Sequence, residues 1–291
     1  MAAGQPFTTL CRSLAQPTCM GRADLHVHTT HSDGDYSPAQ VVDLARRSGL
    51  AALAITDHDT TRAVEEAQDA ALGTSLEIVP GVEISAEFRE REFHLLGYFL
   101  DPRNRALEAA LARIRVNRAE RFRQMIERLR RLRVQVKEES LEPLRDHAVL
   151  GRRHLADLLV KNGQASTVRE AFARYLHDGG PVVVNKIRLP VIEAITCVRA
   201  AGGVASWAHP SYDCKVETLT ELRRAGLSAI EVDYPGIHRR RSLELRTLAE
   251  TLGLAVTAGS DCHGPGGAKR ALGSRTLSTE ELEGLRRLAA G

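Results

Sequence analysis

The stretch from Asp24 to Ser37 brings together side chains that commonly bind metal ions. It is "DLHVHTTHSDGDYS" and contains three histidines and three aspartates. His26 and His28 are two residues apart in a run typical of a β-strand, so their imidazoles face the same side of that strand. Two such histidines can hold one ion, although this spacing also arises by chance. The stretch therefore predicts one part of a metal site whose other ligands must come from elsewhere in the chain.

Further metal-capable side chains recur where other predicted strands end. The segments "ITDHD", "PGVEIS", "FHLLG", "AHP" and "GSDCH" supply His58, Glu83, His94, His209, Asp261 and His263. Imidazoles and carboxylates without thiolates suit Zn²⁺, Mn²⁺ or Fe²⁺ in a catalytic, partly open site. Together with His26, His28 and Asp33 they make nine candidate ligands, more than one ion needs. We therefore expect two to three divalent ions, with Glu83 as a bridging ligand.

These ligands require a fold that gathers strand ends on one face. Strands are expected in seven runs: "ADLHVH", "GLAALAITDHD", "LEIVPGVEIS", "REFHLLGYFL", "GGVASWAHP", "LSAIEVDYP" and "LAVTAGSDCHG". Helices are expected between them at residues 38–48, 61–72, 190–201, 217–225 and 242–252. This alternation predicts a parallel sheet, and seven strands favour a β/α barrel, whose sites lie at the C-terminal ends of the strands.

Residues 101–189 interrupt the alternation. Apolar residues recur there at three- and four-residue steps between positions 107 and 132, which predicts a long amphipathic helix, and shorter helices are expected at 154–162 and 168–176. This segment carries 20 Lys and Arg against 11 Asp and Glu, a balance of +9, whereas the remainder carries 20 against 26, a balance of −6. The pattern predicts metals in the acidic body and an anionic substrate that approaches from the basic segment.

The predicted organisation is accordingly an N-terminal tail at 1–22, expected to be disordered, a barrel in two parts at 23–100 and 190–291, and a helical insertion at 101–189 that covers the site. No apolar run approaches the roughly 20 residues that span a bilayer, so no membrane association is expected. The N-terminal segment lacks the features of a secretory signal. The five cysteines are scattered and odd in number, which favours a reducing compartment and a cytoplasmic location.

The ordered motifs HxH, SDG, TDHD, GVEIS, AHP and GSDxH, together with the histidine of "FHLLG", resemble those of the PHP (polymerase and histidinol phosphatase) phosphoesterase family. The resemblance implies a distorted seven-stranded β/α barrel with a trinuclear metal site, most often Mn²⁺ with Fe²⁺ or Zn²⁺ as alternatives, and phosphoester hydrolysis by metal-activated water. It implies three ligand sets: His26, His28, Glu83 and Asp261; Glu83, His94 and His209; Asp33, His58 and His263. It also implies that these residues are catalytic: Asp33, His58, Glu83, His209 and His263. His31 is expected to lie outside the ligand sets.

Two segments of the insertion, "GRRHLADLL" and "YLHDGGPVVVNKIRLP", resemble the PHP subgroup that acts on nucleotides. Members of that subgroup remove the 3′-phosphate of nucleoside 3′,5′-bisphosphates, and relatives trim short RNA from its 5′ end. The implied substrate contacts are Arg152, His154 and Lys186, with Arg121 or Arg118 in addition. The expected partner is a nucleotide or short RNA, because the basic segment is too local for stable duplex binding.

Three alternatives stay open at this point. A small-molecule phosphatase of the histidinol-phosphate type would use the same metals without this insertion. A metal-dependent amidohydrolase would share the barrel and the histidines, but it usually needs a bridging lysine at a strand end. A non-catalytic interaction module would have lost ligands, whereas all nine are present.

Overall fold

The computed structural model of the chain describes residues 21–290 apart from 145–148, 212–213 and 266. The predicted tail at 1–22 lies mostly outside the described residues. Its last residue, however, belongs to the first strand, because β1 spans Arg22–Val27. Within the described residues, none of the helices is long and apolar enough to cross a membrane.

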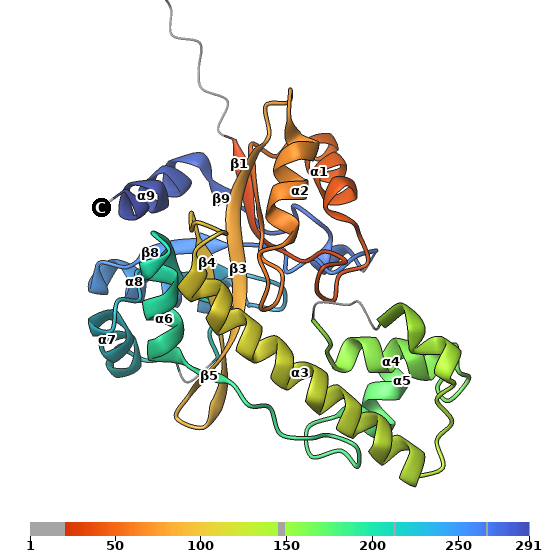
Figure 1. Cartoon of the computed structure of the whole chain (residues 1–291). Helices are drawn as coiled ribbons and strands as arrows, with labels where there is room; N and C mark the ends of the chain where they lie inside the picture. The colour runs from red at the N-terminus through yellow and green to blue at the C-terminus, as the bar shows by residue number, and fades with distance from the viewer. Residues whose placement is uncertain (1–20, 145–148, 212–213, 266, 291) are drawn as a thin grey trace, which may run out of the picture.

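A mixed sheet forms the centre of the molecule (Figure 1). Its strand order is β8-β7-β6-β4-β3-β2-β1-β9, and β5 pairs with β3. The seven longer strands are β1, β2 (Ala52–Ile55), β3 (Glu77–Phe88), β4 (Arg91–Tyr98), β6 (Val204–Trp207), β7 (Ala229–Asp233) and β8 (Ala255–Ala258). The two short strands are β5 (Leu189–Pro190) and β9 (Leu277–Ser278). The predicted number of seven therefore matches the longer strands but is too low for the whole sheet.

The sheet nearly closes on itself. Val27 at the end of β1 forms a parallel bridge with Cys262, which follows β8. The backbone N–H of His28 donates to the carbonyl of Cys262 at 2.9 Å. The predicted α/β barrel with a helical insertion is confirmed, as a nearly closed barrel-like sheet.

The expectation of a wholly parallel sheet is wrong for two strands. β4 runs antiparallel to both β3 and β6, and β9 runs antiparallel to β1. The reason lies in the connection between β3 and β4, because Arg89 and Glu90 alone join them, and a parallel crossover needs a much longer segment. Both turn residues have positive φ, 51° and 63°, as in the tight turns that suit hairpins. Neither is glycine or asparagine, so the sequence carries no hairpin signal there.

Helices cover the sheet on the outside at the expected places, with their ends shifted by a few residues. They are α1 (Pro38–Arg47), α2 (Ala63–Ala71), α6 (Val191–Ala200), α7 (Val216–Arg224) and α8 (Arg239–Leu252). The C-terminal helix α9 (Thr279–Ala289) was not predicted, although a capping box of Ser278 and Glu281 marks its start. Three short 3₁₀ turns lie in loops: η1 (Glu138–Ser140), η2 (Glu142–Leu144) and η4 (Ala268–Arg270).

The insertion is built on the long helix α3 (Arg105–Arg131), with α4 (Arg152–Lys161), α5 (Val168–Ala171) and the π-helical turn η3 (Phe172–Leu176). Figure 1 shows α3 running from the barrel to the group of α4 and α5. Leu111 and Ile114 in its first half pack in the barrel core. Met125 and Leu129 in its second half pack with Leu155 in a separate core. One continuous helix therefore belongs to both parts, and the insertion is more than a cover added to the barrel.

A buried ion pair fixes α3 to the barrel. The guanidinium of Arg118 donates from Nε to Asp59 Oδ2 at 2.7 Å and from Nη2 to Ser85 Oγ at 2.7 Å. The other carboxylate oxygen of Asp59 accepts the backbone N–H of Ser85, also at 2.7 Å. Arg118, a candidate for substrate binding, thus also holds α3 against the barrel.

Gly259 packs closely against His26 of β1 where the sheet nearly closes, and this packing can be tested by mutation. A Cβ added there would lie 2.3 Å from His26 Cβ and 2.5 Å from its backbone nitrogen, neither of which can move freely. We expect Gly259→Ala to lower the free energy of unfolding by about 2 kcal/mol or more, since such overpacking forces the backbone to shift. Denaturant unfolding measures this. Gly267→Ala is the control, because nothing lies within 4 Å of the added Cβ, and an equal loss in both variants would contradict the packing argument.

Candidate metal centre

All nine predicted ligands meet at one end of the barrel. His26 lies on β1 and is followed by His28, Asp33 comes from the next loop, and His58 follows β2. Glu83 and His94 lie within β3 and β4, His209 follows β6, and Asp261 and His263 follow β8. His94 reaches the same end as the others because its strand is antiparallel to its neighbours.

Glu83 is the centre of the cluster and is only 1% exposed. Its Oε1 lies 2.8 Å from His94 Nδ1 and 3.1 Å from His209 Nε2. Its Oε2 lies 3.3 Å from His26 Nε2, 3.2 Å from His28 Nε2 and 3.2 Å from His58 Nδ1. The two oxygens of one carboxylate thus face two different groups of imidazoles, an arrangement that suits a ligand shared between ions.

Two aspartates complete the cluster on the side of β8. Asp33 Oδ1 lies 3.3 Å from His263 Nε2 and 3.8 Å from His28 Nδ1. Asp261 Oδ1 lies 3.3 Å from His28 Nε2 and 3.4 Å from His263 Nδ1. Asp261 has a φ of 47° and His209 has a φ of 30°, a region that non-glycine residues rarely adopt. Such backbone strain is often found at functional sites.

The donor atoms form three overlapping groups, each within 4.8 Å. They are His28, Asp33, His58 and His263; His26, His28 and Glu83; and His58, Glu83 and His94. These groups differ in detail from the predicted ligand sets, because His28 and His58 each take part in two of them. Asp261 and His209 lie beside the groups rather than within them, through the contacts given above.

Several buried nitrogen and oxygen atoms of the cluster lack hydrogen-bond partners among the described residues, which indicates whether divalent ions fit here. His28 Nδ1 and Nε2, Asp33 Oδ1 and His58 Nδ1 are buried and make no hydrogen bond within the described part of the chain. Buried polar atoms are nearly always hydrogen-bonded, so four such atoms in one cluster need another partner. Nitrogen and oxygen donors that converge without hydrogen bonding suit divalent transition-metal ions. The residues present therefore fit a metal centre.

The protonation states of the cluster suit metal binding in part. Burial lowers the pKa of His28 and His94, but the nearby carboxylates raise the two values to about 10 and about 9, so these imidazoles release a proton when an ion binds. Burial alone would raise the pKa of Glu83, but the imidazoles of His58, His94 and His26 hold it well below its usual range. The pKa of Asp33 is held well below its usual range in the same way. Burial lowers the pKa of His58 to about 3, and the nearby carboxylates oppose this only in part. Ionised carboxylates and a neutral imidazole are the forms that coordinate a metal.

Sequence reasoning missed Glu231, a fully buried carboxylate on β7. Its Oε1 lies 3.0 Å from His26 Nδ1, and its Oε2 accepts the backbone N–H of His209 at 2.6 Å. A carboxylate behind the outer nitrogen of a ligating histidine fixes the tautomer and the ring orientation. The signal was the acidic residue at the centre of the strand "AIEVD", flanked on both sides by apolar residues.

The predicted substrate contacts separate into two cavities. Arg121, Arg152 and Lys186 line one of about 370 Å³, together with Arg188, which sequence reasoning missed. His154 lines a second cavity of about 370 Å³, which Asp33 also lines.

The first of these cavities meets the metal cluster through Glu92. Glu92 pairs with Lys186, lies 3.3 Å from Arg188 through Oε2, and lies 3.0 Å from His94 Nε2 through Oε1. Arg152 donates to the Leu176 carbonyl at 3.1 Å. Burial lowers the pKa of Lys186 to about 8, although Glu92 opposes the shift. The cluster and this cationic cavity are thus neighbours that share Glu92 as a wall.

Other residues of the motifs lie near the cluster without facing it. Asp24 accepts the backbone N–H of Ser260 at 2.9 Å and of Gly273 at 2.8 Å, so it organises the loops after β8. The ring of His31 lies 3.1 Å from Glu66 and points away from the cluster. Cys262 is buried in a hydrophobic core.

Glu231 offers a test of how the cluster is positioned. Because one glutamine oxygen cannot accept from both His26 and His209, we expect Glu231→Gln to weaken Mn²⁺ binding about 10- to 100-fold. Titration of metal-free protein with Mn²⁺, followed calorimetrically, measures this without any substrate. Glu193→Gln is the matched control, since Glu193 pairs with Arg113 on the surface. Unchanged binding in Glu231→Gln would show that the buried carboxylate has no positioning role.

Comparison with known proteins agrees with this geometry. The family model described as PHP domain matches residues 24–176. The 3′,5′-nucleoside bisphosphate phosphatase of Chromobacterium violaceum is 34% identical over 270 residues, which cover 90% of this chain and 93% of that protein. The 5′-3′ exoribonuclease Rnm of Salmonella typhimurium is 34% identical over 249 residues, which cover 83% of this chain and 85% of that protein.

A solved structure from Bifidobacterium adolescentis, described as a metal-dependent phosphoesterase, superposes with a TM-score of 0.83 at 31% identity. It covers 93% of this chain and 96% of that one. The chain belongs to the PHP family and is a metal-dependent phosphoesterase.

Proposed function

We propose that this phosphoesterase hydrolyses the 3′-phosphate of nucleoside 3′,5′-bisphosphates to give 5′-mononucleotides. The observation that carries the proposal is the cationic cavity beside the metal centre, joined to it through Glu92. A bisphosphate needs two separate anion sites, one over the reacting phosphorus and one for the phosphate that stays. The relative named 3′,5′-nucleoside bisphosphate phosphatase supports this substrate class.

The nine clustered side chains are proposed to hold two to three divalent ions, with Mn²⁺ the most suitable and Fe²⁺ or Zn²⁺ as alternatives. When bound, such ions activate water and offset the negative charge that develops on a transferring phosphoryl group. Glu83, with one oxygen toward each group of imidazoles, is proposed as the bridging ligand.

The exposure of the cluster indicates which side chains meet the substrate. His26, His28 and Glu83 are covered, whereas the side chains of His209 and His263 are 33% and 22% exposed. We place the reacting phosphate against this open side. Asp33, His58, Glu83, His209 and His263 are the proposed catalytic residues, and the buried ligands hold them in place.

The proposed clamp for the 5′-phosphate consists of Arg121, Arg152, Lys186 and Arg188. Arginine offers two parallel N–H donors to a phosphate, and lysine adds a compact charge. Two of these cations contact carboxylates, since Arg152 pairs with Asp178 and Lys186 pairs with Glu92. His154, from the other cavity, is proposed to contact the substrate beyond Asp33.

Short 5′-phosphorylated RNA is the natural second substrate. It presents the same spacing between its terminal 5′-phosphate and its first 3′-phosphodiester as the bisphosphate does. Stepwise release of mononucleotides in the 5′ to 3′ direction would then use the same two sites, and the relative named 5′-3′ exoribonuclease supports this extension.

Metal stoichiometry tests the proposed ligands. We expect two to three divalent ions per chain in gently purified protein, measured by elemental analysis. Glu83→Gln should lose most of this metal and the activity, because the bridging oxygens face both groups of imidazoles. His31→Ala is the control and should keep both. Less than one equivalent of metal, without activity after addition of Mn²⁺, would contradict the proposed centre.

The clamp predicts a preference for substrates with two phosphates. The ratio of kcat/KM for adenosine 3′,5′-bisphosphate to that for adenosine 3′-phosphate should be well above one. Equal values, or faster turnover of histidinol phosphate, would reject the nucleotide substrate and leave the phosphoesterase activity intact.

Arg152 tests the clamp itself. Loss of one charged hydrogen bond to phosphate costs about 1.5–3 kcal/mol, so Arg152→Ala should raise KM for the bisphosphate roughly 10- to 150-fold. Because this contact concerns the phosphate that does not react, kcat should stay nearly unchanged. Arg174→Ala is the control, since Arg174 pairs with Glu170 on the surface of the insertion and lines neither cavity. Equal KM values in the two variants would show that Arg152 does not bind the 5′-phosphate.

A further inference from the structure

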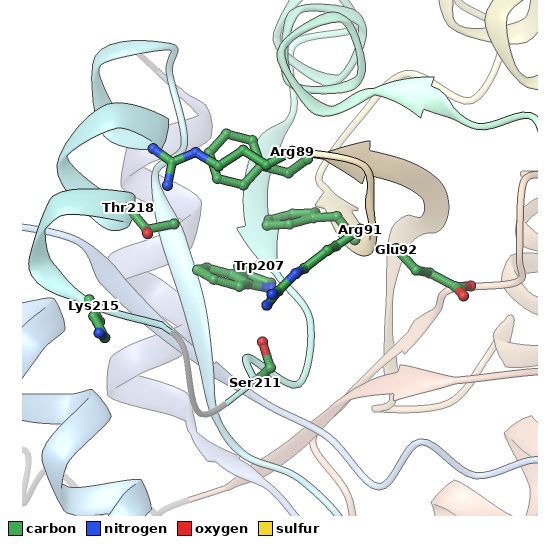
Figure 2. Close-up of a pocket in the computed structure, with 9 residues that line it drawn as sticks. Arg89, Arg91, Glu92, Trp207, Ser211, Lys215 and Thr218 are labelled. Carbon is green, nitrogen blue, oxygen red and sulfur yellow. The ribbon is translucent and has the colours of Figure 1, made fainter. Parts of the chain in front are cut away.

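A third cavity lies on the outer side of the β3–β4 hairpin and has no part in the proposed chemistry. It measures about 830 Å³ and is lined by residues of the hairpin, the end of β6 and the start of α7. We call it the aromatic groove; its lining residues are Phe88, Arg89, Arg91, Glu92, Phe93, Trp207, Ser211, Lys215 and Thr218. Figure 2 shows Arg89 and Thr218 toward one end, Ser211 toward the other, and Trp207 with Arg91 between them.

The floor of the groove is aromatic in a chain with few aromatic residues. Trp207 is the only tryptophan of the protein. Its ring stacks on Phe93 with centroids 4.7 Å apart, and Phe88 meets Phe93 edge-on at 6.3 Å. Only 7% of Trp207 is exposed, and that part lines the groove. Bases of single-stranded nucleic acid stack on aromatic side chains irrespective of sequence, and the partly exposed ring of Phe88 is the one of these three that is most open to a base.

The rim of the groove is cationic. Arg89, Arg91 and Lys215 line it, against the single carboxylate of Glu92. Arg89 pairs with Glu221 at 2.6 Å outside the lining. The ammonium of Lys215 makes no ion pair or hydrogen bond within the residues that the structure describes. Figure 2 shows Glu92 directed away from the other labelled side chains. Among the described residues, Lys215 therefore supplies a positive charge at the rim that no carboxylate pairs with.

The groove is the immediate neighbour of the metal centre. Side chains on a strand alternate between its two faces, so Phe93 lies on the groove side of β4 and His94 on the side of the metal cluster, while Glu92 lines both the groove and the cationic cavity. Trp207 is the last residue of β6 and lines the groove, and His209 follows it in the next loop. The same two strands thus supply histidines to the cluster and aromatic rings to the groove. Glu92 lines both spaces, and Ser211 of the groove lies two residues after His209, so RNA with its first phosphodiester at the cluster would be directed toward this groove.

We propose that the aromatic groove binds the nucleotides on the 3′ side of the cleaved bond in short single-stranded RNA. This inference rests on the proposed function and specifies which of its substrates the chain is built to hold. A nucleoside bisphosphate ends at the reacting phosphate and does not reach the groove. The groove therefore contributes to oligonucleotide binding alone.

The test separates the groove from the catalytic site. The double variant Arg89→Ala/Lys215→Ala removes two exposed cations of the rim, and Arg47→Ala/Arg103→Ala removes two exposed arginines elsewhere as the control. We expect the first variant to lower kcat/KM for a short 5′-phosphorylated oligoribonucleotide about tenfold or more. Its kcat/KM for adenosine 3′,5′-bisphosphate should stay within about twofold of the wild-type value.

Binding is measured independently of turnover through Trp207. A phosphorothioate oligoribonucleotide should change the tryptophan emission of the wild-type protein, and the bisphosphate should leave it unchanged. The proposal that the groove binds RNA would be contradicted if the wild type and the double variant bound the oligonucleotide equally well. It would also be contradicted if the double variant lost kcat/KM equally for both substrates. A third outcome separates the two proposals. If neither substrate is hydrolysed but oligonucleotide binding still depends on Arg89 and Lys215, the proposed function is wrong and the groove is still an RNA-binding site.

Discussion

The burial of the Glu83 carboxylate among five imidazoles is the interaction on which the rest of the structure depends. Removing an ionised carboxylate from water costs several kcal/mol unless partners compensate for the lost hydration. Here the partners arrive from β1, β4 and the ends of β2 and β6. Those strands must therefore end together, and a nearly closed sheet is an arrangement that achieves this. The hairpin that reverses β4 is needed as well, because it returns His94 to the shared end.

Much of this architecture could be predicted from the sequence, because the ligands sit in short motifs that also mark the strand ends. The alternation of strand and helix patterns predicted the barrel and its seven longer strands. The direction of β4 escaped prediction, since Arg89 and Glu90 adopt the turn without glycine or asparagine. Helix α9 was missed even though Ser278 and Glu281 form a capping box.

The details of the site were harder to predict because they depend on tertiary packing. Glu231 makes its contacts with His26 and His209 across strands that are far apart in sequence, so no local pattern reveals them. Arg152 and His154 are two residues apart on one helix, yet they line different cavities, because neighbouring positions on a helix point in different directions. Arg118 carries the same charge as the residues of the clamp, but the buried Asp59 occupies it.

The continuity of α3 has a consequence for how substrates reach the site. Its 27 residues extend about 40 Å and belong to the barrel core at one end and to the insertion core at the other. Hinge closure requires a few residues that can change their backbone angles, and an unbroken helix provides none along its length. The insertion is therefore held in a fixed position relative to the barrel, because α3 offers no hinge about which it could close. The separation between the cationic cavity and the metal centre is therefore set by the fold before any substrate binds.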